Sequence, residues 1–94
     1  MQPDWVAAET ETVELLKTLI GFNTTNPPGH ELPLGESIAT RFRNEGIDTE
    51  LLIPVPDRAI VVARLRGSGV KRPVMLLSHM DVVGVDAGQW TSDP

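Results

Sequence analysis

The first third of the chain carries apolar residues at helical spacing. The stripe consists of Val13, Leu15, Leu16, Leu19 and Ile20. Apolar residues that recur every three to four positions lie on one face of a helix. The pattern therefore predicts a helix from about residue 5 to residue 22. Asp4 is a suitable N-cap for it, and Gly21 marks its end.

A second helical pattern follows a proline-containing connector. Residues 23–29 contain Pro27 and Pro28, which fix φ and lack amide donors, so this segment predicts a rigid connector. The next helix is expected to begin at Leu32 or Pro33, because proline is tolerated in a first turn. Its apolar face consists of Leu34, Ile38, Ala39 and Phe42. Gly46 is expected at the position after the C-cap.

Three short apolar runs predict strands in the rest of the chain. They cover residues 49–55, 59–65 and 73–78. Pro56 and Asp57 mark a turn between the first two, and a Gly-Ser-Gly loop at 67–69 follows the second. Consecutive apolar residues, as in the third run, are typical of strands covered on both faces of an α/β sheet. The predicted order is α-α-β-β-β, in the α/β class.

Composition narrows the function classes. The net charge of -5 leaves no basic stripe for nucleic acid. The chain has no cysteine, so any metal would take nitrogen and oxygen ligands. No signal peptide and no apolar run of about 20 residues is visible, which favours a cytoplasmic protein without a membrane partner.

The candidate metal-site residues lie at the end of the third apolar run. His79 follows the apolar residues, and Asp81 comes two positions later, on the same side of an extended backbone. A metal-binding histidine usually donates its second ring N–H to a carboxylate or carbonyl group. A His-x-Asp triplet alone is more often structural, with the aspartate capping a loop, and one histidine cannot complete a zinc site.

The longer pattern favours the metal-site interpretation. The segments NPPGHE (26–31), LLSHMDVV (76–83) and WTSDP (90–94) occur in a fixed order. Together they resemble the N-terminal part of a zinc metallopeptidase family. That family includes aminoacylase-1, acetylornithine deacetylase, succinyl-diaminopimelate desuccinylase and glutamate carboxypeptidase. The resemblance extends over nearly the whole chain, and the block from residue 79 to 94 is its specific part.

The resemblance implies a fold and a reaction. Residues 1–94 would be the N-terminal portion of a three-layer α/β/α zinc-exopeptidase-like catalytic domain, without the smaller dimerisation or lid domain. The whole enzyme would be a metal-dependent hydrolase of amide bonds in small peptides or N-acyl amino acids. It would hold two Zn²⁺ ions, with Co²⁺ or Mn²⁺ as alternatives, and relatives form homodimers. His79 matches the first zinc ligand, and Asp81 matches the catalytic carboxylate that orients this histidine.

Two departures limit what this chain is expected to do. Gly84 stands where many relatives have proline. The family's bridging aspartate, paired glutamates, further acidic ligand and last histidine have no matching positions. We therefore expect this fragment alone to be inactive and to bind zinc weakly or not at all.

Other interpretations stay open. A different class of function is a small, non-catalytic α/β domain that binds a partner. Assembly in trans with a chain that carries the remaining ligands is a further alternative. In any of these cases, open sheet edges predict self-association of the fragment.

Overall fold

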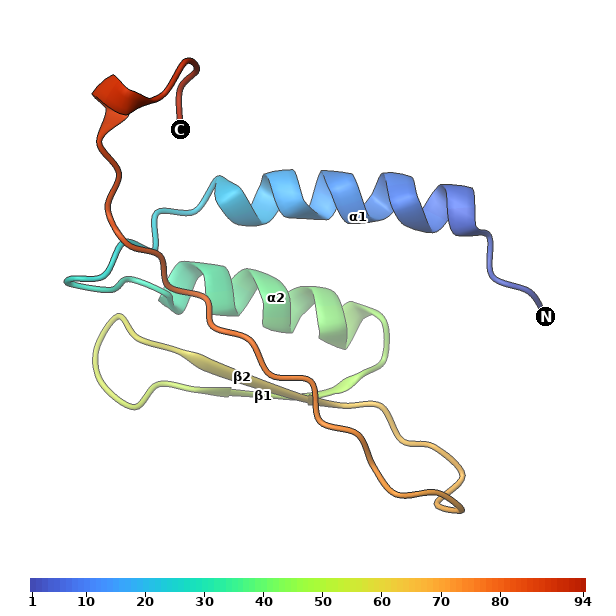
Figure 1. Ribbon diagram of the computed structural model, residues 1–94. Helices are drawn as coiled ribbons and strands as arrows, with labels where there is room; N and C mark the ends of the chain where they lie inside the picture. Colours follow the sequence, from blue (N-terminus) through green and yellow to red (C-terminus); the bar gives the residue numbers. More distant parts are fainter.

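The computed structural model describes residues 1–94. Two helices lie on one side of a two-stranded sheet, and a long extended segment runs beside them (Figure 1). The elements, in chain order, are α1 (Trp5–Ile20), α2 (Leu32–Asn44), β1 (Asp48–Leu52), β2 (Ile60–Arg64) and the short 3₁₀ helix η1 (Ala87–Gln89). The order of the first four elements agrees with the sequence pattern, so the coarse α/β prediction is confirmed.

The ends of both helices follow the predicted caps. Asp4 Oδ1 accepts a hydrogen bond of 3.0 Å from the Ala7 amide at the start of α1, and Gly21 is the C-cap. Helix α2 begins at Leu32, and Gly46 follows its C-cap with a φ of 74°. That left-handed conformation favours glycine, which has no Cβ to clash with the backbone.

Helix α2 packs directly on the sheet. Its buried residues are Leu34, Gly35 and Ala39. A Cβ added at Gly35 would lie 2.8 Å from the Cβ of Ala59 and 3.3 Å from Cδ1 of Leu51. The close approach of the helix to the hairpin therefore requires a residue without a side chain at position 35.

The sheet is an antiparallel hairpin. Glu50 pairs with Val62 and Leu51 with Val61. On the surface, Arg64 Nη1 donates to Glu50 Oε1 at 3.0 Å and Arg66 Nη2 to Asp48 Oδ2 at 3.1 Å. The hairpin connection from residue 53 to residue 59 is irregular. Strand β1 therefore covers only the first part of the predicted run 49–55 and begins one residue before it, whereas β2 covers the centre of the predicted run 59–65.

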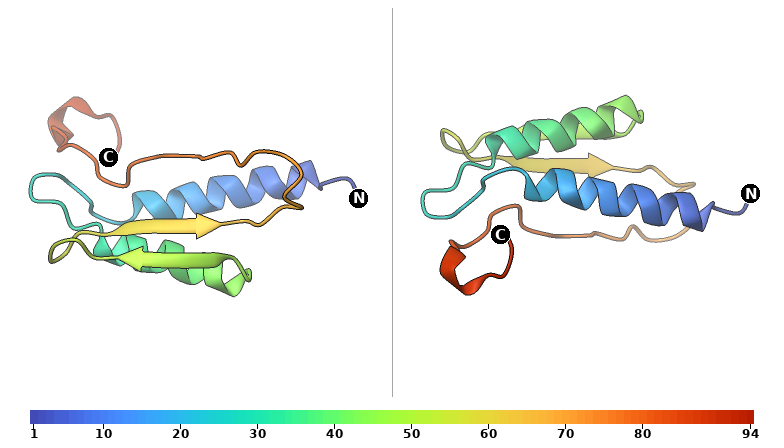
Figure 2. Two further views of the ribbon diagram at one scale, coloured as in Figure 1. Left: turned by 90° about the horizontal axis from the view of Figure 1, so that it is seen from below. Right: turned by 90° about the horizontal axis from the view of Figure 1, so that it is seen from above.

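The prediction of a third strand is wrong, because residues 73–78 do not pair with another strand. Residues 73–78 form no ladder with β1 or β2. They run extended past the helices, antiparallel to β2 and separated from it (Figure 2). A β-strand needs a neighbour that accepts and donates its backbone hydrogen bonds, and none lies beside this segment. The three-layer architecture accordingly stays a prediction.

Burial in the fold is limited. Only 7 of the 94 residues are buried, and their apolar members are Leu34, Ala39 and Ala59. Helix α1 formed as predicted but has no buried residue, so its apolar stripe packs only partly. No helix combines the length and the apolar character that crossing a membrane requires. The small core makes the few buried polar contacts important for stability.

The principal buried polar contact joins the connector to the hairpin. Glu31 accepts a hydrogen bond of 2.5 Å from Arg58 Nε, and the Glu31 side chain is only 4% exposed. That bond is made by Glu31 Oε2, whereas the second carboxylate oxygen, Oε1, is buried and has no hydrogen-bond partner within the chain. Gly29 completes the contact, because a Cβ there would lie 2.8 Å from the Arg58 guanidinium carbon. The arginine is thus the only cation that compensates this buried carboxylate.

We predict that Arg58→Met lowers the free energy of unfolding by about 1–3 kcal/mol, because it leaves the Glu31 carboxylate buried without a donor. Arg64→Met is the matched control, since its partner Glu50 is exposed. That exposed pair should contribute no more than about 1 kcal/mol. Urea denaturation followed by circular dichroism measures both values, and equal effects of the two substitutions would contradict the prediction.

Candidate metal-ligand site

Three hydrogen bonds place His79 and Asp81 beside the connector. The Asn26 amide donates to the Val82 carbonyl oxygen at 2.8 Å, and the Val82 amide donates to the Thr24 carbonyl oxygen at 3.1 Å. These two bonds form an isolated parallel bridge between Thr25 and Val82. The Asn26 side-chain amide then donates to Asp81 Oδ2 at 2.9 Å. The connector therefore fixes the end of the extended segment where the candidate site lies.

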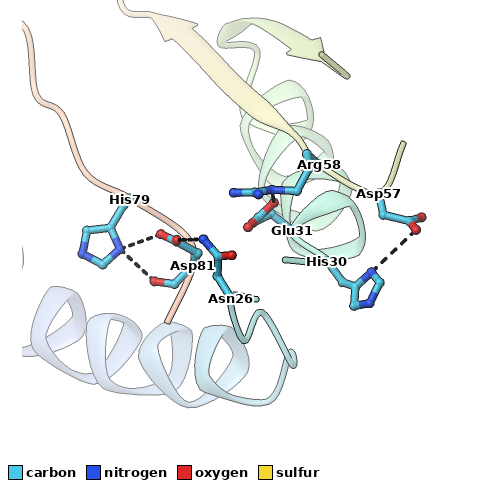
Figure 3. Close-up of polar contacts among 7 residues, drawn as sticks. All are labelled: Asn26, His30, Glu31, Asp57, Arg58, His79 and Asp81. Atoms are coloured by element: carbon cyan, nitrogen blue, oxygen red, sulfur yellow. Dashed lines mark hydrogen bonds and ion pairs between the residues drawn. The ribbon is translucent and has the colours of Figure 1, made fainter. Parts of the chain in front are cut away.

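The histidine and the aspartate contact each other directly. His79 Nδ1 lies 2.8 Å from the Asp81 backbone oxygen and 3.1 Å from Asp81 Oδ1 (Figure 3). Both oxygens can only accept hydrogen bonds, so Nδ1 carries the hydrogen that it donates to them. The assigned tautomer thus carries its hydrogen on Nδ1 and leaves the lone pair on Nε2. The His79 side chain is 83% exposed, and Nε2 has no partner within the chain.

The aspartate is held in its charged form. The hydrogen bond from Asn26 is the main reason that the pKa of Asp81 lies below its ordinary value, and the electrostatic interaction and hydrogen bond with His79 add to this effect. Partial desolvation acts in the opposite direction and is outweighed. The Asp81 side chain is 33% exposed and lies between the amide and the imidazole. A carboxylate in this position keeps the Nδ1 proton in place and orients the ring.

The site contains one metal ligand and its orienting group. No group of three or more histidine, aspartate or glutamate side chains in the chain is placed to hold a metal ion. His79 fits one ligand position through Nε2, but zinc sites in proteins use three or four ligands. The residues therefore fit part of a metal centre, and this chain does not complete one.

The second histidine and the buried glutamate of the connector contribute no group to the site. His30 Nδ1 is 3.6 Å from Asp57 Oδ2 on the surface, and Figure 3 shows this pair pointing away from His79. Glu31 is buried against Arg58, so its carboxylate bonds within the fold and not to the site. His30 is thus separate from the candidate site.

Sequence reasoning missed one member of the site. Asn26 was interpreted only as part of a rigid connector, yet its side chain binds Asp81 across 55 positions of sequence. The local pattern holds no signal for this contact, because a residue before proline is simply expected to be extended. The only sequence signal for the contact is that Asn26 and Asp81 both belong to motifs that carry the family resemblance.

We predict that Asn26→Ala raises the pKa of Asp81 towards its ordinary value of 3.8. A lowered folded-state pKa stabilises the fold above about pH 3.8, and that stabilisation is lost as the pH falls through the lowered pKa. The substitution should therefore reduce the loss of stability in acid. Carboxyl-carbon NMR titration measures the pKa, and unfolding between pH 2 and 6 measures the stability.

Asn23→Ala is the control for this experiment. Asn23 Oδ1 accepts from the Thr25 amide at 3.2 Å, so it belongs to the same connector without touching Asp81. The pKa of Asp81 should be unchanged in this variant. An equal rise in both variants would show that the connector as a whole, and not the Asn26 amide, sets the charge state.

Comparison with known proteins adds no relative. No protein-family model, curated protein or solved structure matches the chain. The resemblance to the zinc metallopeptidases therefore rests on the motifs of the sequence.

Proposed function

We propose that this chain is the N-terminal portion of the catalytic domain of a dizinc metallopeptidase or amidohydrolase. The observation that carries the proposal is the pair His79 and Asp81, in which the carboxylate and the backbone oxygen hold Nδ1–H and leave Nε2 free. A metal ligand needs that tautomer and that orientation. The substrates would be small peptides or N-acyl amino acids, and the protein would act in the cytoplasm.

Each residue of the site has a defined task in this proposal. His79 binds the metal through Nε2, Asp81 orients the imidazole, and Asn26 holds Asp81 charged. When bound, zinc supplies Lewis acidity that polarises the scissile carbonyl group. Asp81 contacts neither metal nor substrate in this arrangement, so its contribution to the reaction is positional.

Because the ligand set is incomplete, these residues alone should show no hydrolytic activity. One imidazole offers a single coordination bond, whereas catalytic zinc sites have three protein ligands and one open position. A second proposal, a small α/β binding domain, gains some support from the exposed apolar surface of the extended segment. The two proposals differ in whether His79 matters to a metal-dependent reaction.

We predict that the 94-residue chain shows no hydrolysis of N-acyl amino acids and only weak zinc binding. Isothermal titration with zinc and a hydrolysis assay measure both. In NMR spectra, zinc should shift the Nε2 resonance of His79 more than any resonance of His30, the only other histidine. Tight stoichiometric binding with turnover would contradict the idea that the site is partial.

We also predict the behaviour of the protein expressed from its complete reading frame. It should hydrolyse N-acyl amino acids or small peptides in the presence of zinc, and His79→Ala should abolish this activity. Asp81→Asn should weaken zinc binding by about 10–100-fold, because the group that orients the ligand is altered. His30→Ala is the matched control and should leave both properties unchanged. Full activity of the His79→Ala variant would rule out the proposed function.

A further inference from the structure

The buried pair of Glu31 and Arg58 joins the start of α2 to the hairpin. Arg58 Nε donates to Glu31 Oε2 across 27 positions of sequence, and the Glu31 side chain is only 4% exposed. Beside this ion pair, the Leu32 amide donates to the Asp57 carbonyl oxygen at 3.0 Å. One charged bond and one backbone bond therefore attach the residues that follow the connector to the turn before β2.

Gly29 lies between this pair and the connector. A Cβ at position 29 would lie 2.8 Å from Arg58 Cζ and 2.9 Å from Glu31 Oε1, so the Gly29 backbone is in contact with both side chains. Its φ of 81° is a second reason that only glycine fits. The Gly29 amide donates to the Thr25 carbonyl oxygen at 2.9 Å. The buried pair therefore adjoins one end of the turn from residue 25 to residue 29.

The other end of this turn holds the candidate metal ligand. Thr25 forms the backbone bridge with Val82. The Asn26 side chain donates to Asp81 Oδ2, and Asp81 in turn holds Nδ1–H of His79 (Figure 3). Direct contacts therefore lead without a gap from the arginine to the imidazole.

Polar contacts, and not apolar packing, fix the position of this stretch. Three of the 7 buried residues lie in it, namely Thr24, Gly29 and Glu31, and none has a large apolar side chain. The pair of Glu31 and Arg58 is the only ion pair of the chain with a buried member. Its directional bond specifies one geometry, which apolar contacts of similar size would not.

We propose that Glu31 and Arg58 are positioning residues that set the orientation of the His79 imidazole. Neither side chain bonds to the site directly, so the effect passes through Gly29 and the turn. Without the pair the turn can shift, and the Asn26 amide then loses its bonding distance to the carboxylate of the site. The inference rests on the proposed function only where it treats His79 as a metal ligand, because the orientation of the ring is a property of the chain without metal.

A double substitution separates this role from a contribution to stability. Removal of one partner leaves a buried charge, whereas replacement of both by apolar residues of similar size is often neutral for stability. Glu31→Met combined with Arg58→Met keeps the volume and removes the directional bond. We expect the double variant to unfold at nearly the same urea concentration as the unchanged chain, while Arg58→Met alone unfolds at a lower one.

The tautomer of His79 is the readout in the 94-residue chain. Nitrogen NMR shifts at about pH 9, where histidine is neutral, report which ring nitrogen carries the hydrogen. The unchanged chain should show the Nδ1–H form. In the double variant, the shifts should move towards the Nε2–H form that free neutral histidine prefers. A stable double variant with the Nδ1–H form intact would overturn the proposal, because the pair would then serve stability alone.

Gly29→Ala tests the same contact with both charges in place. Gly46→Ala is the matched control, because its φ of 74° imposes the same backbone strain while its added Cβ has no atom within 4 Å. Only the Gly29 variant should move His79 towards the Nε2–H form. Equal tautomers in the two variants would overturn the proposal, whether or not the double methionine variant folds.

Zinc binding by the protein from its complete reading frame separates this inference from the proposed function. The double variant should bind zinc about tenfold more weakly, as expected when a contact that orients a ligand is lost. A protein that binds no zinc, although the tautomer shifts as expected, would contradict the proposed function and leave the orienting role of the pair in place. Unchanged zinc affinity in a variant whose tautomer has shifted would overturn the link between the pair and the metal site.

Discussion

The structure depends on the hydrogen bonds between the connector and residues 81 and 82. Residues 65–80 cross the molecule without a single backbone hydrogen bond to another element, so their far end must be held elsewhere. The bridge between Thr25 and Val82 holds it, and the Asn26 side chain adds a third bond through Asp81. The same bonds that fix the path of the chain also set the charge and the orientation of the candidate metal ligand.

The connector can perform this task because its other end is fixed to the hairpin. Glu31 and Arg58 join the start of α2 to the turn before β2, in a contact that only glycine at position 29 permits. The buried core is too small to position the connector by packing alone. A buried ion pair costs desolvation energy, yet it specifies one partner and one geometry. The polar contacts thus define the arrangement that the apolar core only partly determines.

Local sequence signals were sufficient for the helices and the hairpin. Asp4, Gly21 and Gly46 act through short-range capping, so their roles follow from the residues next to them. The proximity of His79 and Asp81 is equally local, because it depends only on a spacing of two along an extended chain. Asn26 and the unpaired state of residues 73–78 could not be predicted in this way. Both depend on what lies beside them in space, and apolar periodicity contains no information about that.

The unpaired segment and the incomplete site have a common physical cause. An apolar run adopts an extended conformation through its own side chains, but it becomes part of a sheet only when a neighbour supplies backbone partners. In the same way, Asp81 prepares one histidine for a metal, but coordination requires further ligands at fixed positions. Each feature is organised by contacts within the chain and is completed only by groups from outside those contacts.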